Sequence, residues 1–278
     1  MNSITPTLAQ ALNQAHTLGL ARIDAQLLLL HALGRPDAGR AWLLAHDTDA
    51  MEETVHTQFI ALCQRRAAGE PVAYLTGRKE FYGLPLQVDA RVLDPRPDTE
   101  TLVDWALEVM APLASPRVVD LGTGSGAIAL ALQSQRTDAQ VLAVDASTDA
   151  LAVAQANGKR LGLPVRFQAA NWLAGVEGMF DAIVSNPPYI ASADPHLAAL
   201  THEPLQALAS GSDGLDDIRT IVAQAPNHLR AGGWLLLEHG YDQAEAVQAL
   251  LQAQGFRQVQ SRTDLAGVDR CTGGCWMA

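Results

Sequence analysis

Cysteine is scarce in this sequence, with only Cys63, Cys271 and Cys275 among 278 residues. Three thiols cannot all pair with one another. The run from Cys271 to Cys275 also has no second pair of sulfur or imidazole ligands at a metal-finger spacing. We therefore expect reduced thiols and no structural metal.

Long apolar runs are also absent. No stretch approaches the ~18 consecutive apolar residues that a membrane-spanning helix needs, and the early run Leu27–Leu30 ends at His31. The first residues lack the basic and apolar regions of a signal peptide. The expectation is a cytoplasmic protein without a membrane segment.

Positive charge is in deficit, because 19 Lys and Arg residues oppose 30 Asp and Glu residues for a net charge of −11. Duplex binding draws most of its affinity from Lys and Arg that neutralise phosphates. The composition therefore argues against DNA as a partner and favours a basic protein. The hydrophobic fraction of 48% is that of an ordinary globular chain, and its length allows one large domain with a smaller companion.

Three parts follow one another along the chain. Residues 1–75 have apolar residues at helical spacing, which predicts four or five helices. No catalytic constellation occurs in them, so substrate recognition is the expected role. Residues 76–95 contain Phe81 and Tyr82 before a glycine and an alternating pattern, which predicts a hairpin linker. Residues 96–278 are expected to form the catalytic domain.

Strand and helix patterns alternate through this third part. A first helix is expected over 98–112, with Asp98 or Thr99 as its N-cap. The elements expected after it are strand 117–121, helix 127–134, strand 141–145, helix 149–161, strands 165–168 and 180–185, helix 215–229, strand 234–238, helix 242–253 and strand 256–261. Near-continuous apolar strands separated by helices predict an α/β fold with a parallel, doubly wound sheet.

A glycine-rich turn joins the first of these strands to its helix, with the sequence Asp-Leu-Gly-Thr-Gly-Ser-Gly over 120–126. Its glycines allow a tight turn and a close approach of ligand to backbone. Asp145 ends the next strand and could accept both ribose hydroxyls of an adenosine or cap the following helix. Gly122, Gly124 and Ala127 also satisfy the looser dinucleotide pattern. A nicotinamide dinucleotide therefore stays open, while the acidic start of the turn favours the cationic S-adenosylmethionine.

The chemical centre is expected at Asn186-Pro187-Pro188-Tyr189, directly after strand 180–185. Two prolines stiffen the turn and donate no N–H, so the Pro187 carbonyl and the Asn186 side-chain oxygen can accept from an incoming NH2 group. Such a nitrogen is a weak nucleophile, and positioning would carry its methylation. Tyr189 offers a ring for stacking. A rigid turn is the plain alternative, and the residues leave the acceptor open between a protein amide and a nucleic-acid base.

Seven segments recur in one known family: Glu70–Gly77, Phe81–Gly83, Pro95–Glu100, Asp120–Gly126, Asn186–Tyr189, Glu203–Pro204 and Leu237–Gly240. Together they resemble the PrmC/HemK protein-glutamine methyltransferases nearly from end to end. The resemblance implies a Rossmann-like seven-stranded class I S-adenosylmethionine-dependent methyltransferase domain with a small all-helical N-terminal domain. It also implies N5 methylation of the glutamine in the Gly-Gly-Gln motif of class I peptide chain release factors, with S-adenosylhomocysteine as the product and translation termination as the process served.

The resemblance also implies roles for single residues. The residues expected to contact the cofactor are Gly122, Thr123, Gly124, Ser125, Gly126, Asp145, Trp172 and Asn186. Asn186, Pro187 and Tyr189 would be catalytic, and Pro188 would join them in holding the glutamine amide. No metal is expected at the site, and neither DNA nor a membrane is expected as a partner.

Several positions depart from the family pattern or have no clear role. Asp94 stands where an apolar residue is usual, and Asn171 stands where an aspartate commonly precedes Trp172. The tail over 271–276 reads as a final strand broken by glycine. Arg96 could pair with the cofactor carboxylate, contact the substrate backbone or lie free at the surface.

The sequence also suggests roles for Glu238, His239 and Trp172, and it leaves alternative functions open for the whole chain. Glu238 and His239, at a strand end, are expected to be structural rather than catalytic. Trp172 could stack on adenine or belong to the core. A dehydrogenase and a binding module that has lost turnover remain the alternatives from other classes.

Overall fold

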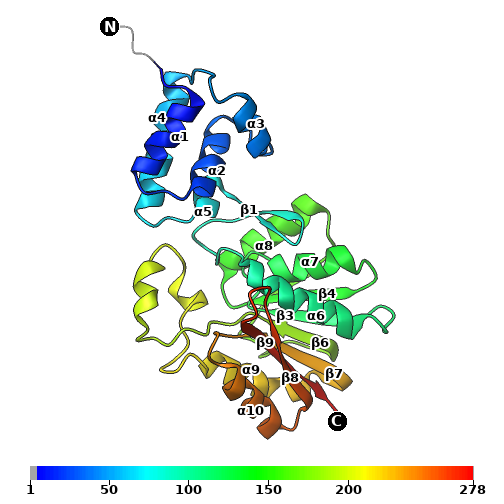
Figure 1. Cartoon of the computed structure of the whole chain (residues 1–278). Coiled ribbons are helices and arrows are strands. Elements are labelled where there is room, and N and C mark those ends of the chain that lie inside the picture. The colour runs from blue at the N-terminus through cyan, green and yellow to red at the C-terminus, as the bar shows by residue number, and fades with distance from the viewer. Residues whose placement is uncertain (1–4, 278) are drawn as a thin grey trace. The chain divides into compact units, whose positions relative to one another are not determined.

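The computed structural model describes residues 5–277, which form two compact units divided between Arg78 and Lys79. The first unit is helical throughout its described part and is blue to cyan in Figure 1. Its helices are α1 Leu8–Thr17, α2 Arg22–Ala32, α3 Arg40–Ala45, α4 Glu53–Ala67 and α5 Val72–Thr76. The four or five helices predicted from the sequence are therefore present.

Apolar residues three or four positions apart give these helices one buried face each. The core of the first unit includes Leu8, Ala11, Ala15, Leu28, Leu29 and Phe59. α1 begins with a capping box, in which the Thr7 hydroxyl accepts from the Gln10 N–H and the Gln10 side chain accepts from the Thr7 N–H. α5 ends at Gly77, whose φ of +67° closes the helix.

A sheet with the strand order β5-β4-β3-β6-β7-β9-β8 forms the centre of the second unit. Its strands are β3 Arg117–Leu121, β4 Gln140–Asp145, β5 Arg166–Ala169, β6 Phe180–Ser185, β7 Leu229–Glu238, β8 Arg257–Thr263 and β9 Asp269–Trp276. Its helices are α6 Glu100–Met110, α7 Ala127–Gln135, α8 Thr148–Leu161, α9 Asp216–Gln224 and α10 Ala244–Gln254, with short 3-10 helices η1 Pro97–Thr99, η2 Pro195–Ala199, η3 Leu205–Ala207 and η4 Ala225–Asn227. The seven-stranded domain implied by the resemblance is confirmed.

The expectation of a wholly parallel sheet is wrong at one edge. β3 to β7 pair in parallel, whereas β9 runs antiparallel to both β7 and β8. The connection over 264–268 is too short for the crossover that a parallel pair requires. β8 and β9 therefore form a hairpin that closes the sheet.

Alternate residues of each central strand face opposite sides of the sheet. Val119 and Leu121 of β3 pack with Ile183 of β6 into a core completed by Ile221 of α9 and Val247 of α10. Figure 1 shows α6, α7 and α8 on the other face. Both faces are thus covered, which explains why the central strands are apolar throughout. No helix of the described residues is long and apolar enough to cross a membrane.

β1 (Arg78–Phe81) and β2 (Leu84–Gln87) form a two-stranded hairpin where the sequence predicts one. Tyr82 and Gly83 both have positive φ, 51° and 77°, as a type I′ turn requires. The Tyr82 hydroxyl donates to Asp104 Oδ1 of α6 at 2.6 Å. This bond fastens the turn to α6 within the second unit.

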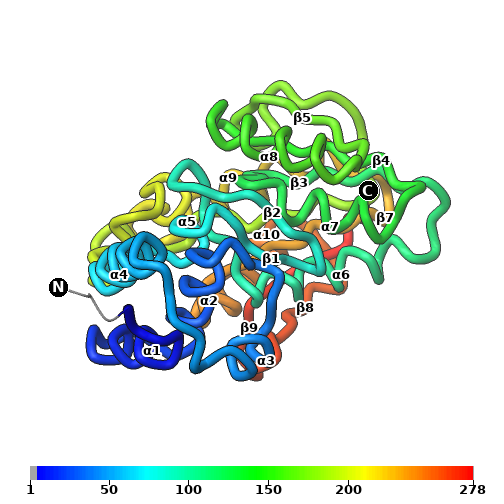
Figure 2. Tube along the Cα trace, turned by 90° about the horizontal axis from the view of Figure 1, so that it is seen from above, coloured from blue at the N-terminus to red at the C-terminus, as the bar shows by residue number. Residues whose placement is uncertain are grey.

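Prolines explain how two helices differ from the prediction, while the other helices expected in this unit differ by one or two residues at their ends. The helix expected over 98–112 starts as η1, with Pro97 at its first position, and continues as α6. The helix expected over 215–229 ends at Gln224, because Pro226 lacks the N–H that another α-helical turn would use. The chain between β6 and α9, yellow in Figures 1 and 2, projects from the sheet edge before it returns.

β9 pairs with β7 along its length, so the expected glycine-broken strand is wrong. A Cβ on Gly273 would lie 2.5 Å from the Leu236 side chain and 2.9 Å from the Trp105 ring. Glycine thus makes room for Trp105 of α6, which is fully buried. Cys271 and Cys275 lie on the same strand as buried, free thiols.

Replacing Gly273 by alanine should lower the free energy of unfolding by about 1–3 kcal/mol, because the added methyl group overpacks a filled site. Gly39→Ala is the control, since Gly39 has an extended backbone and no atom lies within 4 Å of its Cβ position. Urea unfolding of both variants and the parent measures the effect. Equal stability of Gly273→Ala and the parent would contradict the packing argument.

Candidate active site

The carboxyl ends of β3, β4 and β6 meet at one edge of the sheet. Leu121 pairs with Val144 on one side and with Ser185 on the other. Because these strands are parallel, the glycine loop after β3, Asp145 at the end of β4 and Asn186 after β6 all emerge together. The pairing register thus brings together three segments that are far apart in the sequence.

A cavity of about 440 Å³ opens at this edge, a size typical of small-molecule sites. Five of the eight residues expected to contact the cofactor line it: Gly122, Gly124, Asp145, Trp172 and Asn186. Pro188 and Asn171 line it as well. Thr123, Ser125 and Gly126 are not among its lining residues.

The Asp145 carboxylate organises the loop at the cavity. Its Oδ2 accepts from the Gly124 N–H at 2.9 Å, and its Oδ1 accepts from the Ser147 N–H at 2.8 Å. Burial raises the pKa of Asp145, while these backbone donors act in the opposite direction. Ser147 is the residue that caps α8, because its hydroxyl accepts from the Ala150 N–H. Asp145 therefore holds the glycine loop against the end of β4.

Trp172 forms a wall of the same cavity. Its backbone φ is +53°, in the left-handed region that a bulky residue rarely adopts. Its indole Nε1–H donates to Asp217 Oδ1 at 3.1 Å. A Cβ on Gly122 would lie 3.2 Å from the indole ring, so the ring packs closely on the loop backbone. Loop and carboxylate together hold the indole in one orientation.

The residues of the glycine loop that do not line the cavity hold the loop in place. The fully buried Asp120 accepts through Oδ2 from the Thr123 hydroxyl at 2.6 Å and from the Ala129 N–H at 3.1 Å. Burial raises the pKa of Asp120 to about 7. A Cβ on Gly126 would lie 3.2 Å from that of Ala154, so this glycine serves the contact between α7 and α8.

A second, smaller cavity of about 140 Å³ adjoins the first. The two share Leu93, Asn186 and Ala207 as lining residues. Arg96 and Tyr189 line only the second cavity. Asn186 therefore lies at the junction of a larger and a smaller compartment. Pro187, by contrast, is buried and lines neither.

Two hydrogen bonds anchor the ends of the Asn-Pro-Pro-Tyr motif. Asn186 Nδ2–H donates to Thr99 Oγ1 at 3.2 Å, and the Tyr189 hydroxyl donates to Glu238 Oε1 at 3.4 Å. Glu238 is fully buried, and burial raises its pKa to about 7 against the effect of hydrogen bonds from Thr99 and Tyr189. Burial and the Glu238 charge raise the pKa of Tyr189. Glu238, expected to be only structural, contacts the motif directly.

Arg96 forms an ion pair beside the second cavity. Its guanidinium lies 2.6 Å from Glu203 Oε1, and the Asp94 N–H donates to the other carboxylate oxygen at 3.3 Å. Asp94, at a position usually apolar, pairs with Lys79 at 3.1 Å. The Glu203-Pro204 and Pro95–Glu100 segments of the resemblance thus contact each other.

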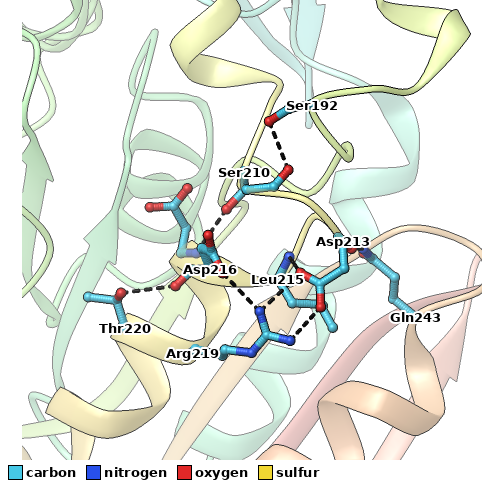
Figure 3. A network of polar contacts seen from close by, with 10 residues as sticks. Ser192, Ser210, Asp213, Leu215, Asp216, Arg219, Thr220 and Gln243 are labelled. Carbon is cyan, nitrogen blue, oxygen red and sulfur yellow. Dashed lines mark hydrogen bonds and ion pairs between the residues drawn. The ribbon is translucent and has the colours of Figure 1, made fainter.

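A polar network joins α9 to the segment before it and to Gln243, which precedes α10 (Figure 3). Arg219 pairs with Asp213 and Asp216, and Gln243 Nε2 donates to the carbonyls of Tyr189 at 3.0 Å and Asp213 at 3.2 Å. The network fixes the backbone at Tyr189. Sequence reasoning missed these supporting residues, because isolated polar residues carry no motif signal.

Thr99 and Asp217 were also missed as site residues. The sequence predicts Thr99 only as a helix cap, although this residue lies in a segment that carries the resemblance. Its membership of that segment is the signal in the sequence that could have marked Thr99 as a site residue. Asp217 stands in the first turn of α9, where an acidic residue is ordinary, so nothing local marks its contact with Trp172.

Comparisons with known proteins cover nearly the whole chain. A family model described as the methyltransferase small domain matches residues 99–263, and one described as the PrmC N-terminal domain matches residues 7–77. The release factor glutamine methyltransferase of Burkholderia pseudomallei is 47% identical over 284 residues and covers 99% of both chains. Those of Bordetella pertussis and Xylella fastidiosa are each 50% identical, over 92% and 95% of this chain and 95% and 96% of their own.

Solved structures share the fold at lower identity. The catalytic domain of hMettl16, in complex with MAT2A 3'UTR hairpin 6, has a TM-score of 0.59 at 16% identity and covers 78% of this chain and 82% of its own. The Thermus thermophilus 16S rRNA N2 G1207 methyltransferase, in complex with AdoMet and guanosine, has a TM-score of 0.54 at 19% identity, covering 72% and 49%. At this distance the likeness concerns the fold alone.

Asp145→Ala should weaken binding of S-adenosylmethionine by about tenfold or more, because hydrogen bonds to a charged group contribute about 1.5–3 kcal/mol. Titration calorimetry with the free cofactor measures the affinity. Asp149→Ala is the matched control, since this carboxylate lies in the first turn of α8 and does not line the cavity. A cofactor affinity unchanged by Asp145→Ala would remove Asp145 from the site.

Asp120→Asn should gain stability relative to the parent as the pH rises from 5 to 8. The pKa of Asp120 in the folded state, about 7, lies above the ordinary value of 3.8. The folded state therefore binds its proton more tightly than the unfolded state, and ionisation in this window costs the parent stability. Urea unfolding at several pH values measures the difference, and a pH-independent difference would contradict the raised pKa.

Proposed function

The chain belongs to the family of release factor glutamine methyltransferases, and from this premise we propose its acceptor and the role of each site residue. It is an S-adenosylmethionine-dependent protein-glutamine methyltransferase. The acceptor is the side-chain amide nitrogen, N5, of the glutamine in the Gly-Gly-Gln motif of class I peptide chain release factors. The names of the relatives favour this protein amide over a nucleic-acid base.

The observation that carries the assignment is the position of Asn186 at the junction of the two cavities. The larger cavity has the size for a nucleoside-containing cofactor. The smaller has the size and lining for a single side-chain amide, with the Tyr189 ring as one wall. A donor and an acceptor placed in these compartments meet at Asn186, which is what methyl transfer requires.

The cavity residues fit S-adenosylmethionine. Asp145 has a carboxylate at the cavity whose oxygens can accept further hydrogen bonds, as ribose hydroxyls require. Trp172 and Asn171 flank the same space and suit a purine ring. Gly122 and Gly124 line the cavity without side chains, so the cofactor can approach the backbone. When bound, the cofactor supplies a methyl group on a positively charged sulfur.

The protein's own contribution is to hold the amide. The side-chain oxygen of Asn186, at the junction of the cavities, accepts from one N–H bond of the glutamine amide. The Pro187 carbonyl accepts from the other N–H bond by its backbone oxygen alone, since the Pro187 residue lines neither cavity. These two bonds localise the nitrogen lone pair for attack. Tyr189 stacks on the amide plane. Pro188 lines the larger cavity next to Asn186. The stiff Pro-Pro turn keeps these groups in place before the substrate arrives. The two accepting oxygens stabilise the positive charge that develops on the nitrogen. The methylated nitrogen then loses one proton to solvent, with neutral S-adenosylhomocysteine as the second product.

The partner and the location follow from the same proposal. A net charge of −11 suits a basic protein partner better than DNA. The helical first unit, which matches the PrmC N-terminal domain, recognises the release factor outside its Gly-Gly-Gln loop. Release factors act in translation termination, so the enzyme works in the cytoplasm.

Incubation with labelled S-adenosylmethionine and a purified class I release factor should transfer one methyl group to the factor. A factor whose Gly-Gly-Gln glutamine is replaced by alanine should accept none, because the nucleophile is gone. A factor with another exposed glutamine replaced is the control. Continued labelling of the Gly-Gly-Ala factor, or transfer to RNA or DNA instead, would overturn the proposed acceptor.

A further inference from the structure

One glutamine beside the Asn-Pro-Pro-Tyr motif has no part in the mechanism above, although three backbone segments meet at its side chain. Gln243 directly precedes α10 and lines neither cavity. Its Oε1 accepts from the Gly240 N–H at 2.8 Å. Its Nε2 donates to the carbonyls of Tyr189 at 3.0 Å and Asp213 at 3.2 Å (Figure 3). One carboxamide thus joins the turn after β7, the motif and the chain before α9.

The chemistry of these three partners calls for a carboxamide. Two carbonyl oxygens need donors, and one backbone N–H needs an acceptor. A carboxylate at this place has no N–H for the carbonyls, and an ammonium group has no acceptor for Gly240. Only an amide side chain satisfies all three groups, and leaving them unpaired costs free energy.

Gly214 brings the chain before α9 close to this carboxamide. It is buried, and its φ is +78°. A Cβ at this position would overlap the Tyr189 carbonyl oxygen and lie 2.7 Å from Gln243 Nε2. Only glycine therefore lets the chain pass directly against the backbone of the motif.

The bond from Gln243 matters for the ring of Tyr189, which lines the smaller cavity. The hydroxyl end of that ring is held weakly, because its distance to Glu238 Oε1 is 3.4 Å, longer than the about 2.7 Å typical of O–H···O hydrogen bonds. The bond to the Tyr189 carbonyl, at 3.0 Å, has the ordinary length for an N–H donor. The place of the ring thus depends on its backbone.

The bond to Asp213 reaches toward the larger cavity. Asp213 lies three positions before α9, whose first turn contains Asp217. Asp217 lines the larger cavity and accepts from the indole of Trp172, another lining residue. Gln243 therefore links a wall of the smaller cavity to the helix that supports a wall of the larger one.

We propose that Gln243 is a positioning residue, which holds the Tyr189 ring at a fixed distance from the cofactor wall on α9 and so sets the approach of the acceptor amide to the methyl group. This inference rests on the proposed function, because it concerns how the same site holds the glutamine. A misplacement of about 1 Å costs about 10²-fold in rate. Loss of Gln243 therefore acts on the transfer step rather than on binding.

Methyl transfer to a release factor at saturating S-adenosylmethionine separates kcat from KM and tests the proposal on the full chain. Gln243→Met keeps the length of the side chain but lacks both N–H donors, and it should lower kcat by about 10²-fold. KM for the factor and the calorimetric Kd for the cofactor should stay near their parental values. Gln243→Glu keeps the acceptor for Gly240 but turns a carboxylate toward two carbonyls, so its kcat should fall at least as far.

Gln248→Met is the matched control for these variants. Gln248 is also half-buried, lies on α10 and donates through Nε2 to Ser261 Oγ at 2.7 Å, away from both cavities. Its replacement removes a glutamine hydrogen bond of the same kind and should leave kcat at the parental value. A loss of kcat confined to position 243 separates positioning from a general effect on stability.

Gly214→Ala disturbs the same contact from the other side, because its methyl group displaces the Tyr189 carbonyl from Gln243. This variant should also lower kcat. Gly232→Ala is its control, since Gly232 has a similar φ of +83° but no atom within 4 Å of its Cβ position. The double variant Gln243→Met/Gly214→Ala should be no slower than the slower single variant, because both changes break one contact.

Three outcomes would overturn the proposal: parental kcat in Gln243→Met and Gln243→Glu, a raised KM or Kd with parental kcat in either variant, or an equal loss of kcat in Gln248→Met. If one variant at position 243 does not fold, the other variant and Gly214→Ala still decide. Failure of the proposed function has a different signature. In that case the parent itself transfers no methyl group to the release factor, although it binds the cofactor.

Discussion

Parallel pairing of β3 with β4 and β6 is the constraint on which the site depends. It sets Leu121 opposite Val144 and Ser185, so the glycine loop, Asp145 and Asn186 start at the same level of the sheet. A slip of one residue in either pair would move the residues that pack in one core to the core on the other face. The apolar cores on both faces therefore fix the register, and the register brings the glycine loop, Asp145 and Asn186 to the same cavity.

Much of this arrangement was predictable, because the signals are local. The strand at 180–185 matches β6 residue for residue, since its apolar residues Phe180 and Ala182–Val184 are interrupted only by Asp181, as suits a strand covered on both faces. The residues at the strand ends follow from the same pattern. The antiparallel β9 was misread because Gly273 looks like a break, while its role is to admit Trp105, 168 positions earlier in the chain.

The support around the motif was not predictable for the same reason. Thr99 contacts Asn186 across 87 positions, and Glu238 contacts Tyr189 across 49. Only the folded chain brings such groups together, and a lone threonine or glutamate has no pattern. Both residues do lie in segments that carry the family resemblance. That the two segments support the same motif appears only in the folded structure.

The contact of Trp105 with Gly273 has a consequence for redesign of the enzyme. α6 carries Trp105 in its second turn and follows directly on Thr99, while β9 lies against the strand that ends in Glu238. The contact therefore stabilises the two elements that carry Thr99 and Glu238, which bind the two ends of the Asn-Pro-Pro-Tyr motif. Variation meant to admit other acceptors belongs in the projecting chain between β6 and α9, where Leu200, Ala207 and Leu208 line the smaller cavity, and the contact of Trp105 with Gly273 is best left as it is.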